Sequence, residues 1–258
     1  MRHGAPGSVR AMRRLWPEPL DDVDVDELIA AEERPTPPGR PWLLVNMISS
    51  LDGAITIEGQ SGGLGRPADR AVFSALRSVA DIVMAGAGTV RAERYGPARP
   101  TGQQQAARVA RGQAEVPPIA VVTRSLDLDL AGRLFQSDGP RPIVVTCAAA
   151  PADRRAATEN VADVIVVGDD TVDLPAALAA LGERGAAVVT CEGGPRLNGD
   201  LVVDDLIDEW AQTFSPLLTG GESPRGAAGP TPPAPREMVL DRLLEGDGLL
   251  LSRWLRRR

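Results

Sequence analysis

The segment Ala186-Ala-Val-Val-Thr-Cys-Glu-Gly-Gly-Pro-Arg-Leu-Asn-Gly-Asp200 carries the clearest fold signal in the chain. It begins as an apolar run without polar alternation, which suits a strand buried on both faces. The strand ends at Glu192-Gly-Gly194, and Pro195 suits the first turn of a helix. Glycines let a backbone approach a ligand closely, and a helix N-terminus offers free N–H groups to a diphosphate. A plain strand-to-helix turn with an incidental glutamate explains the same residues, so the segment alone leaves both interpretations open.

Similar apolar runs lie before this segment and are predicted to be strands of the same sheet. They occupy residues 42–48, 81–86, 118–123, 142–146 and 163–168. Helical patterns separate them: one at 67–80 places Val72, Leu76 and Val79 on a single stripe, and another at 174–184 ends before Gly185. Strands that alternate with helices predict an α/β fold with a mostly parallel central sheet.

The two ends of the chain do not show this alternation of apolar runs and helical patterns. Residues 1–40 are expected to be an N-terminal extension and linker, with an acidic helix at 21–31 and a proline-rich stretch at 34–40. Residues 41–258 are expected to form one domain. After Asp204 the pattern changes to two or three longer strands, with candidates at 209–218 and 246–256 on either side of a glycine- and proline-rich loop at 220–235.

The composition excludes several kinds of chemistry. All 28 basic residues are arginines, and the single histidine is His3. Schiff-base catalysis by lysine, histidine-based triads and histidine-ligated zinc are therefore not expected, and no metal site is predicted. Cys147 and Cys191 are too few for a disulfide framework. An enzyme with this composition needs a bound cofactor to carry most of the chemistry.

The net charge and the hydropathy of the chain limit the kinds of partner and the cellular compartment that are expected. The net charge is −7, and aromatic residues make up only 3% of the chain. A nucleic-acid partner is therefore not expected, because both the attractive field and the base-stacking side chains are weak. No long apolar run indicates a signal peptide or a membrane span, so a cytoplasmic protein without a membrane partner is expected.

Polar side chains at two further strand ends are candidate ligand contacts. Thr123-Arg124-Ser125 suits the 2′-phosphate of NADPH, with Arg124 offering a bidentate fork, although a capped loop with a solvated arginine also explains it. Asn46 lies inside the first strand, where a buried amide needs partners that a ligand amide or a pyrimidine edge supplies. Asp52-Gly53, which follows, is an ordinary turn signal.

The predicted helix at 67–80 and the segment after residue 86 contain arginines with two interpretations. Arg77 lies off the apolar stripe, where most arginines face solvent. Three further arginines surround Glu93 and Tyr95 and fit either a phosphorylated substrate or a helix lined by ion pairs; they are Arg91, Arg94 and Arg99.

In combination, these pieces resemble the reductase domain of riboflavin biosynthesis, a stand-alone pyrimidine reductase without the deaminase domain. The resemblance covers about Pro41 to Leu255 and rests on six short motifs in the family's order. They are N-x-x-x-S-L-D-G at Asn46–Gly53, S-G at Ser61–Gly62, L-R at Leu76–Arg77, G-T-V-x-x-E at Gly88–Glu93, T-R-S at Thr123–Ser125, and E-G-G-P-x-L at Glu192–Leu197. The resemblance implies a three-layer dihydrofolate-reductase-like fold with antiparallel C-terminal strands.

The resemblance also implies a reaction and a set of site residues. Family members transfer a hydride from NADPH to the ribose C1′ of 5-amino-6-(5-phosphoribosylamino)uracil, and many are homodimers. Positions that match substrate contacts are Met47, Arg77 and Glu192, and Glu192, Asp52 and Asn46 are the catalytic candidates. Positions that match cofactor contacts are Ser61, Thr89, Glu93, Thr123, Arg124, Ser125, and the loop from Gly193 through Gly194, Pro195, Arg196 and Leu197 to Asp200.

Departures from the family pattern keep alternatives open. Pro97 and Pro100 stand where relatives bind substrate. A reductase of another heterocycle, such as dihydrofolate or a pterin, is the second hypothesis; such enzymes hold the pteridine with a carboxylate on the helix after the first crossover, where this sequence offers Arg77. A non-catalytic NADPH-binding protein is the third.

Overall fold

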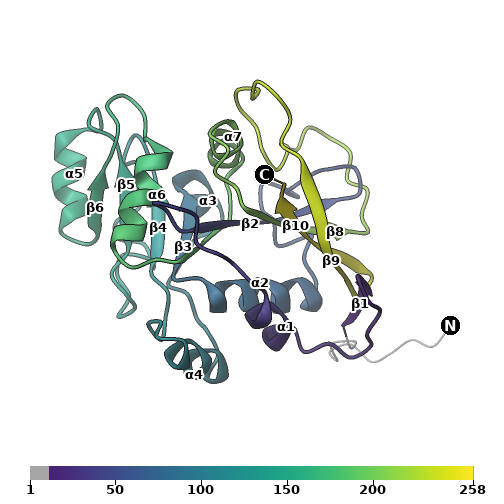
Figure 1. The fold of residues 1–258 in the computed structure, drawn as a ribbon. Coiled ribbons are helices and arrows are strands. Elements are labelled where there is room, and N and C mark those ends of the chain that lie inside the picture. The colour runs from purple at the N-terminus through teal and green to yellow at the C-terminus, as the bar shows by residue number, and fades with distance from the viewer. Residues whose placement is uncertain (1–11, 258) are drawn as a thin grey trace.

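The computed structural model describes residues 12–257, so His3 lies outside the described part of the chain. Its strands are β1 (Arg13–Trp16), β2 (Trp42–Ser50), β3 (Ile82–Gly86), β4 (Ile119–Val122), β5 (Ile143–Thr146), β6 (Asp163–Val166), β7 (Val188–Cys191), β8 (Glu209–Ser215), β9 (Met238–Gly246) and β10 (Leu249–Arg256). Its helices are α1 (Val25–Ala31), α2 (Pro67–Val79), α3 (Ala87–Ala92), α4 (Gly102–Ala110), α5 (Ala152–Glu159), α6 (Leu174–Glu183) and α7 (Pro195–Val203). Figure 1 shows their arrangement.

Within the described residues, one ten-stranded sheet runs through the molecule in the order β1-β9-β10-β8-β2-β7-β3-β4-β5-β6. All pairs from β8 through β2 to β6 are parallel, whereas β10 pairs antiparallel with both β8 and β9. The expected α/β fold with a mostly parallel sheet and antiparallel C-terminal strands is therefore confirmed. The apolar runs at β2, β3, β4, β5 and β7 are mostly buried because both faces of these central strands are covered, whereas the run at the edge strand β6 is partly exposed.

Alternate residues of the central strands face two separate layers. Leu43 and Val45 point into a core that α6 and α7 cover, and Leu44 between them points toward α1 and α2. At β3, Val83 and Ala85 join the layer of α3 instead. This period of two places helices on both faces of the sheet and gives the molecule three layers.

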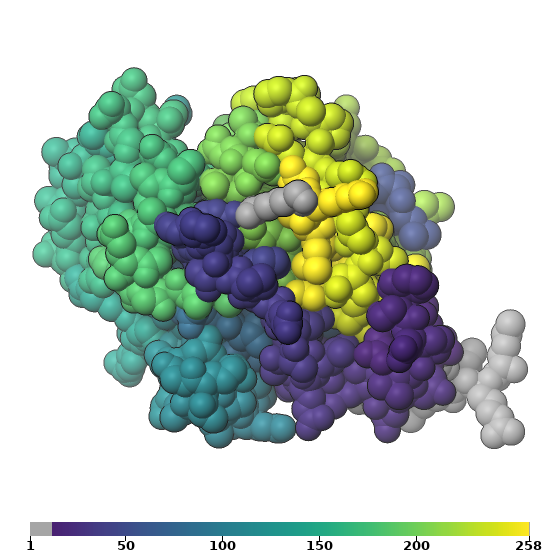
Figure 2. Space-filling model, viewed as in Figure 1, coloured from purple at the N-terminus to yellow at the C-terminus, as the bar shows by residue number. Residues whose placement is uncertain are grey.

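The described part of the N-terminal extension is built into this architecture. β1 pairs antiparallel with β9, and Ile29 of α1 is fully buried against α2. Figure 2 shows the N-terminal segment, in purple, lying against the C-terminal strands, in yellow. The acidic helix expected at 21–31 begins only at Val25, because Asp24 caps it by accepting from the Glu27 amide.

The late strands agree with the expectation of two or three after Asp204. β8 and β10 occupy the candidate ranges at 209–218 and 246–256, and β9, for which no range was predicted, lies between the loop at 220–235 and β10. β9 joins β10 through a tight turn at Asp247 and Gly248, both with positive φ. No helix in the described residues is long and apolar enough to cross a membrane.

Candidate active site

The carboxyl ends of β2, β3, β4 and β7 open into a cleft with a volume of about 1060 Å³. Parallel strands end at one edge of a sheet, so motifs that are far apart in sequence meet there. Of the sequence-predicted site residues, fifteen line this cleft: Asn46, Met47, Ser61, Arg77, Thr89, Glu93, Thr123, Arg124, Ser125, Glu192, Gly193, Gly194, Pro195, Arg196 and Leu197. Asp200 lines it as well.

Glu192 follows β7 and is held by two side chains from other elements. Arg77 of α2 donates from Nε to Oε1 at 2.6 Å and from Nη2 to Oε2 at 2.7 Å. The Tyr95 hydroxyl donates to Oε2 at 2.6 Å. The Arg77 guanidinium also lies over the Phe73 ring, 4.3 Å from its centroid. Charge-assisted and bidentate contacts of this kind fix a carboxylate in one orientation.

The electrostatics of this cluster follow from burial and pairing. Burial opposes ionisation of Arg77, but the attraction and hydrogen bonds of Glu192 outweigh it, so the pKa of Arg77 is raised. Burial and then the negative charge of Glu192 raise the pKa of Tyr95 well above its ordinary value. Tyr95 is therefore protonated and donates to Glu192 across the whole physiological pH range.

The glycines beside Glu192 bring the backbone to the cleft wall. The Gly86 amide donates to the Gly193 carbonyl at 2.8 Å, which joins the ends of β3 and β7. Gly193 has φ +88, and a Cβ there would lie 3.3 Å from the Met47 sulfur. A Cβ on Gly194 would lie 3.0 Å from the Thr89 hydroxyl oxygen. Only glycine leaves this surface open to a ligand.

One helix start and one strand end lie beside these glycines. α7 begins at Pro195, so the amides of Arg196 and Leu197 have no carbonyl one turn earlier and can bind an anionic group. At the end of β4, Thr123 accepts from the Leu126 amide, and the Arg124 guanidinium is exposed. Arg124 has no side-chain partner within residues 12–257. This set fits a dinucleotide: free amides for a diphosphate, and an unpaired arginine for a further phosphate.

Other predicted residues shape the cleft in different ways. Glu93 accepts from the Ser61 amide at 2.8 Å, so it holds the loop after β2 against the end of α3. Met47 packs against Asn198, whose Nδ2 also donates to the Gly226 carbonyl at 2.7 Å. The side-chain amide of Asn46 makes no hydrogen bond to another described residue, although Asn46 lines the cleft.

Asp52, a catalytic candidate from the sequence, lies outside the cleft lining. Its carboxylate accepts from the Ser50 hydroxyl and from the amides of Thr219 and Gly220. These hydrogen bonds, that of Ser50 first, lower the pKa of Asp52 to about 2. The residue joins the turn after β2 to the loop after β8.

Two residues of the site, Tyr95 and Asp69, were not predicted from the sequence. Tyr95 was noted only as a neighbour of arginines, although it is the single tyrosine of the chain and contacts Glu192. Asp69, in the first turn of α2, lines the cleft, and burial raises its pKa. Its position two residues after Pro67, at a predicted helix start, was the signal that could have located it.

The glycine- and proline-rich loop at 220–235 borders the same cleft. The Ser223 hydroxyl accepts from the amides of Ile55 and Thr56, and the Ala228 amide donates to the Pro195 carbonyl at 2.9 Å. Pro224 and Ala228 line the cleft. The loop therefore forms one wall of the site, next to the start of α7.

A model of a known protein family matches most of the chain. The model of the RibD C-terminal domain matches residues 41–243. The chain belongs to the RibD C-terminal domain family. That match spans every strand from β2 to β8 and all the cleft-lining residues named above.

Individual relatives agree with the family assignment. The chain is 30% identical over 183 residues to the 2,5-diamino-6-ribosylamino-4(3H)-pyrimidinone 5′-phosphate reductase of Archaeoglobus fulgidus, covering 70% of this chain and 83% of that protein. The reductase of the same name from Aquifex aeolicus is also 30% identical, over 190 residues that cover 71% and 80% of the two chains. The crystal structure of a pyrimidine reductase-like protein from Corynebacterium diphtheriae superposes with a TM-score of 0.81 at 26% identity, covering 92% of this chain and all of that one.

Proposed function

We propose that this protein is an NADPH-dependent reductase of a phosphoribosylaminopyrimidine, with 5-amino-6-(5-phosphoribosylamino)uracil as the leading substrate. The observation that carries the proposal is the Arg77–Glu192–Tyr95 cluster, which lies directly beside the glycine cradle at Gly193 and Gly194. A hydride-transfer site needs a side chain that holds the substrate next to a surface that fits a dinucleotide, because the reaction depends on close positioning of two bound molecules. The Glu192 carboxylate, held in one orientation, can be that side chain. The family membership and the names of the relatives support the same reaction class.

The cofactor assignment rests on the fit of the cleft. The first turn of α7 would bind the diphosphate, and Arg124 with Thr123 and Ser125 would bind a 2′-phosphate at the end of β4. When bound, a reduced nicotinamide supplies the hydride that the protein itself cannot provide. Gly194 and Thr89 line the cleft next to Glu192, and a side chain on Gly194 would contact the Thr89 hydroxyl.

The protein's own groups would bind the acceptor and handle its proton. Oε2 of Glu192 already accepts from both Arg77 and Tyr95, whereas Oε1 accepts from Arg77 alone and retains capacity for a further hydrogen bond from the cleft side. Glu192 is therefore assigned to fixing the substrate and to exchanging a proton with it. Asn46, with its amide unpartnered, is assigned to the pyrimidine edge. Asp52 is assigned to holding the loop at Thr219 and Gly220, since its carboxylate is fully engaged there.

Arg124 tests the choice of NADPH over NADH. A charge-assisted contact contributes about 1.5–3 kcal/mol, so Arg124→Ala is expected to weaken NADPH binding about 10- to 100-fold. NADH binding is expected to stay unchanged in a fluorescence titration. Arg184→Ala, an exposed arginine after α6, is the matched control. Equal losses for both cofactors would contradict the assignment.

One observation favours a second candidate function, the reduction of dihydrofolate or a pterin. Besides Arg77, the helix after β2 places the Asp69 carboxyl in the cleft. Burial raises the pKa of Asp69, so its carboxyl keeps a proton to higher pH than an exposed aspartate and is suited to donate it to a heterocycle nitrogen. The third hypothesis, a non-catalytic NADPH-binding protein, predicts cofactor binding without turnover.

NADPH consumption by the purified protein separates these functions. The acceptors are the deaminated uracil substrate, its 2,5-diamino counterpart and dihydrofolate, each assayed with NADPH and NADH. Turnover of a ribosylaminopyrimidine, faster with NADPH, is the expected result. Turnover of dihydrofolate alone, abolished in Asp69→Asn, would establish the second candidate. No turnover with any acceptor, while NADPH raises the melting temperature, would favour the binding protein.

The proposal includes a cytoplasmic homodimer. Phe214 of β8 and Leu250 of β10 are cross-strand partners, and both are exposed on the sheet face opposite α2. A second copy would cover this apolar pair in an isologous contact. Light scattering after size exclusion is expected to give twice the chain mass, and Leu250→Glu is expected to give monomers.

A further inference from the structure

Arg108 of α4 is a buried arginine that makes no ion pair within residues 12–257. Its side chain is 0% exposed, and its Nη2 atom has no hydrogen-bond partner among these residues. Burial lowers its pKa to about 10, so the guanidinium still carries its charge at neutral pH. Burying a charge without a counter-ion costs free energy, which an apolar side chain of similar length would avoid. This placement indicates a role other than stability alone.

The guanidinium of Arg108 caps the C-terminal end of α2. Its Nη1 atom lies 3.3 Å from the carbonyl oxygen of Arg77, 3.0 Å from that of Ser78 and 2.6 Å from that of Ala80. The last carbonyls of a helix have no partner inside the helix and carry partial negative charge. A cation held among them satisfies these oxygens and complements the helix dipole.

Two residues that follow α4 complete this cap. Arg111 donates from Nη2 to the Ser78 carbonyl at 2.8 Å, and Gln113 donates from Nε2 to the Val79 carbonyl at 3.0 Å. Unlike Arg108, neither of these two side chains is buried. Together, α4 and the residues after it supply a donor for each α2 carbonyl from residue 77 to residue 80.

α4 is itself attached to two other helices through the buried Gln104. The Ser74 hydroxyl of α2 donates to Gln104 Oε1 at 3.1 Å, and Gln104 Nε2 donates to the Asp26 carboxylate of α1 at 2.9 Å. Gln104 and Arg108 are four residues apart, so they lie on the same face of α4. This face therefore holds α2 both in its middle and at its end.

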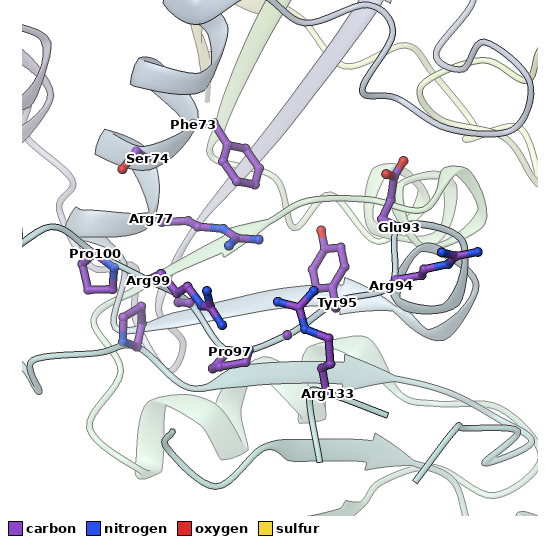
Figure 3. A pocket seen from close by; sticks show the side chains of 13 residues that line it. Phe73, Ser74, Arg77, Glu93, Arg94, Tyr95, Pro97, Arg99, Pro100 and Arg133 are labelled. Atoms are coloured by element: carbon purple, nitrogen blue, oxygen red, sulfur yellow. The ribbon is translucent and has the colours of Figure 1, made fainter. Parts of the chain in front are cut away.

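The turn of α2 that Arg108 caps also carries Arg77. Figure 3 shows the Arg77 side chain extending from α2 toward Tyr95. Its guanidinium donates to the two oxygens of Glu192 at 2.6 and 2.7 Å. Glu192 follows β7, so the sheet determines its position, whereas the position of Arg77 depends on where the last turn of α2 is held.

We propose that Arg108 is a positioning residue of the active site. It fixes the last turn of α2, and through that turn it keeps the Arg77 guanidinium aligned with both oxygens of Glu192. Arg108 does not line the cleft, so it acts on the reaction only through Arg77. The expected effect on turnover rests on the proposed function, whereas the effect on the Arg77–Glu192 pair does not.

Steady-state kinetics of Arg108→Met give the first test, at a temperature at which every variant is folded. The kcat for the phosphoribosylaminopyrimidine is expected to fall about 10- to 100-fold, because a small displacement of a positioning group has an effect of this size. The KM for NADPH is expected to stay unchanged, since the proposed cofactor contacts lie at β4 and α7. Arg108→Lys, which keeps a cation beside the α2 carbonyls, is expected to restore most of kcat. Arg34→Met, which removes a buried arginine that pairs with Glu209 of β8, is the control and is expected to keep the wild-type kcat.

NMR gives a readout that needs no turnover. The ¹H–¹⁵N signal of Arg77 Nε, identified by its loss in Arg77→Lys, reports directly on the hydrogen bond to Glu192. Its proton is expected to exchange slowly with water in the wild type and in Arg34→Met. In Arg108→Met the exchange is expected to be at least 10-fold faster, because the last turn of α2 is no longer held.

The outcomes separate the positioning role from the proposed reaction. Faster exchange at Arg77 in Arg108→Met, in a protein that turns over no pyrimidine, would keep the positioning role and refute the reaction. A wild-type kcat together with wild-type exchange in folded Arg108→Met would overturn the positioning role, and so would equal losses in Arg34→Met. If Arg108→Met does not fold, Arg111→Met takes its place, since it removes one donor to Ser78 from an exposed side chain. Faster exchange at Arg77 in that variant supports the proposal, and unchanged exchange overturns it.

Discussion

Glu192 is the residue on which the proposed chemistry depends. Its carboxylate meets three donors, two from Arg77 and one from Tyr95, and the acidic function is lost in Glu192→Gln while the shape is kept. We expect kcat to fall about 10²- to 10⁴-fold, the usual contribution of a positioned acid or base. Steady-state kinetics measure this, with Glu183→Gln on the exposed end of α6 as the control. A wild-type rate would reduce Glu192 to a binding role.

Tyr95 allows a direct test of the electrostatics of the cluster. It is the single tyrosine of the chain, so the tyrosinate absorbance reports on it alone. Burial and the charge of Glu192 hold its pKa well above 10. An absorbance titration is expected to show no ionisation until the pH is well above 10 or the protein unfolds, and Glu192→Gln is expected to lower the titration midpoint. Ionisation of the folded wild-type protein near pH 10 would show that Tyr95 is not enclosed with Glu192.

Because folding raises the pKa of Tyr95, this residue makes the free energy of unfolding depend on pH. The folded protein holds the phenolic proton to higher pH than the unfolded chain does. The stabilisation is therefore complete below the ordinary tyrosine pKa of 10.0 and is lost as the pH rises toward the folded value. Tyr95→Phe removes this dependence, and urea unfolding from neutral to alkaline pH measures it.

At the level of elements, the junction after β7 is the most constrained. Gly193 has φ +88, and a Cβ there would lie 3.3 Å from the Met47 sulfur and 3.5 Å from Nδ2 of Asn198. Gly193→Ala is expected to lower the free energy of unfolding by about 1–2 kcal/mol, because a side chain strains this backbone conformation. Urea denaturation measures the loss.

Gly88→Ala is the matched control for that substitution. Gly88 lies in α3, and a Cβ there would have no heavy atom within 4 Å. Alanine is favoured over glycine in a helix, so this variant is expected to be neutral or more stable by up to about 1 kcal/mol. Equal losses in both variants would show that the positive φ of Gly193 does not matter.

The sequence predicted those elements that carry a signal of their own. Five parallel strands are mostly buried apolar runs, namely β2, β3, β4, β5 and β7, and β6 is an apolar run at the sheet edge that is partly exposed. The helices α2 and α6 have apolar stripes bounded by proline or glycine. β1 was missed because Arg13–Trp16 is mostly exposed and is defined only by its pairing with β9. α4 was missed because it is polar, although Thr101 and Gln104 form the capping box that marks its start.

The candidate site was predictable to the extent that it follows short motifs. Residues at strand ends, such as Glu192 and Ser125, reach the cleft because parallel strands share one edge. Asp69 lies in the first turn of a helix that the sequence predicts, but only the packing of that helix against the sheet brings its carboxyl into the cleft. Asp52 matched a motif but lies outside the cleft lining, and its carboxylate accepts from the amides of Thr219 and Gly220.

At the scale of the whole molecule, a buried ionic cluster joins the N-terminal extension to the sheet. Arg34 donates from Nε to the fully buried Glu209 of β8 at 3.0 Å, and Arg253 of β10 pairs with the same carboxylate. Burial alone would raise the pKa of Glu209, but the two guanidinium groups outweigh it, so the pKa is lowered. The extension thus completes the charge balance of the core.

Removing one charged partner from this cluster is expected to lower the free energy of unfolding. Arg34→Met leaves Glu209 with one guanidinium fewer, and breaking a buried pair typically costs about 3–5 kcal/mol. Arg13→Met removes an exposed pair with Glu245 and is expected to cost less than about 1 kcal/mol. Chemical denaturation of both variants measures the difference. Similar stabilities would show that the extension is not energetically coupled to the sheet.

The central claim is that the cleft brings a reduced nicotinamide and a phosphoribosylaminopyrimidine into direct contact. NADPH carrying deuterium at the transferring position of C4 tests it most directly, with mass spectrometry and NMR of the pyrimidine product. We predict one deuterium per product molecule, located at C1′ of the ribityl chain. Product without deuterium, or deuterium on a reduced pterin and none on the pyrimidine, would contradict the account.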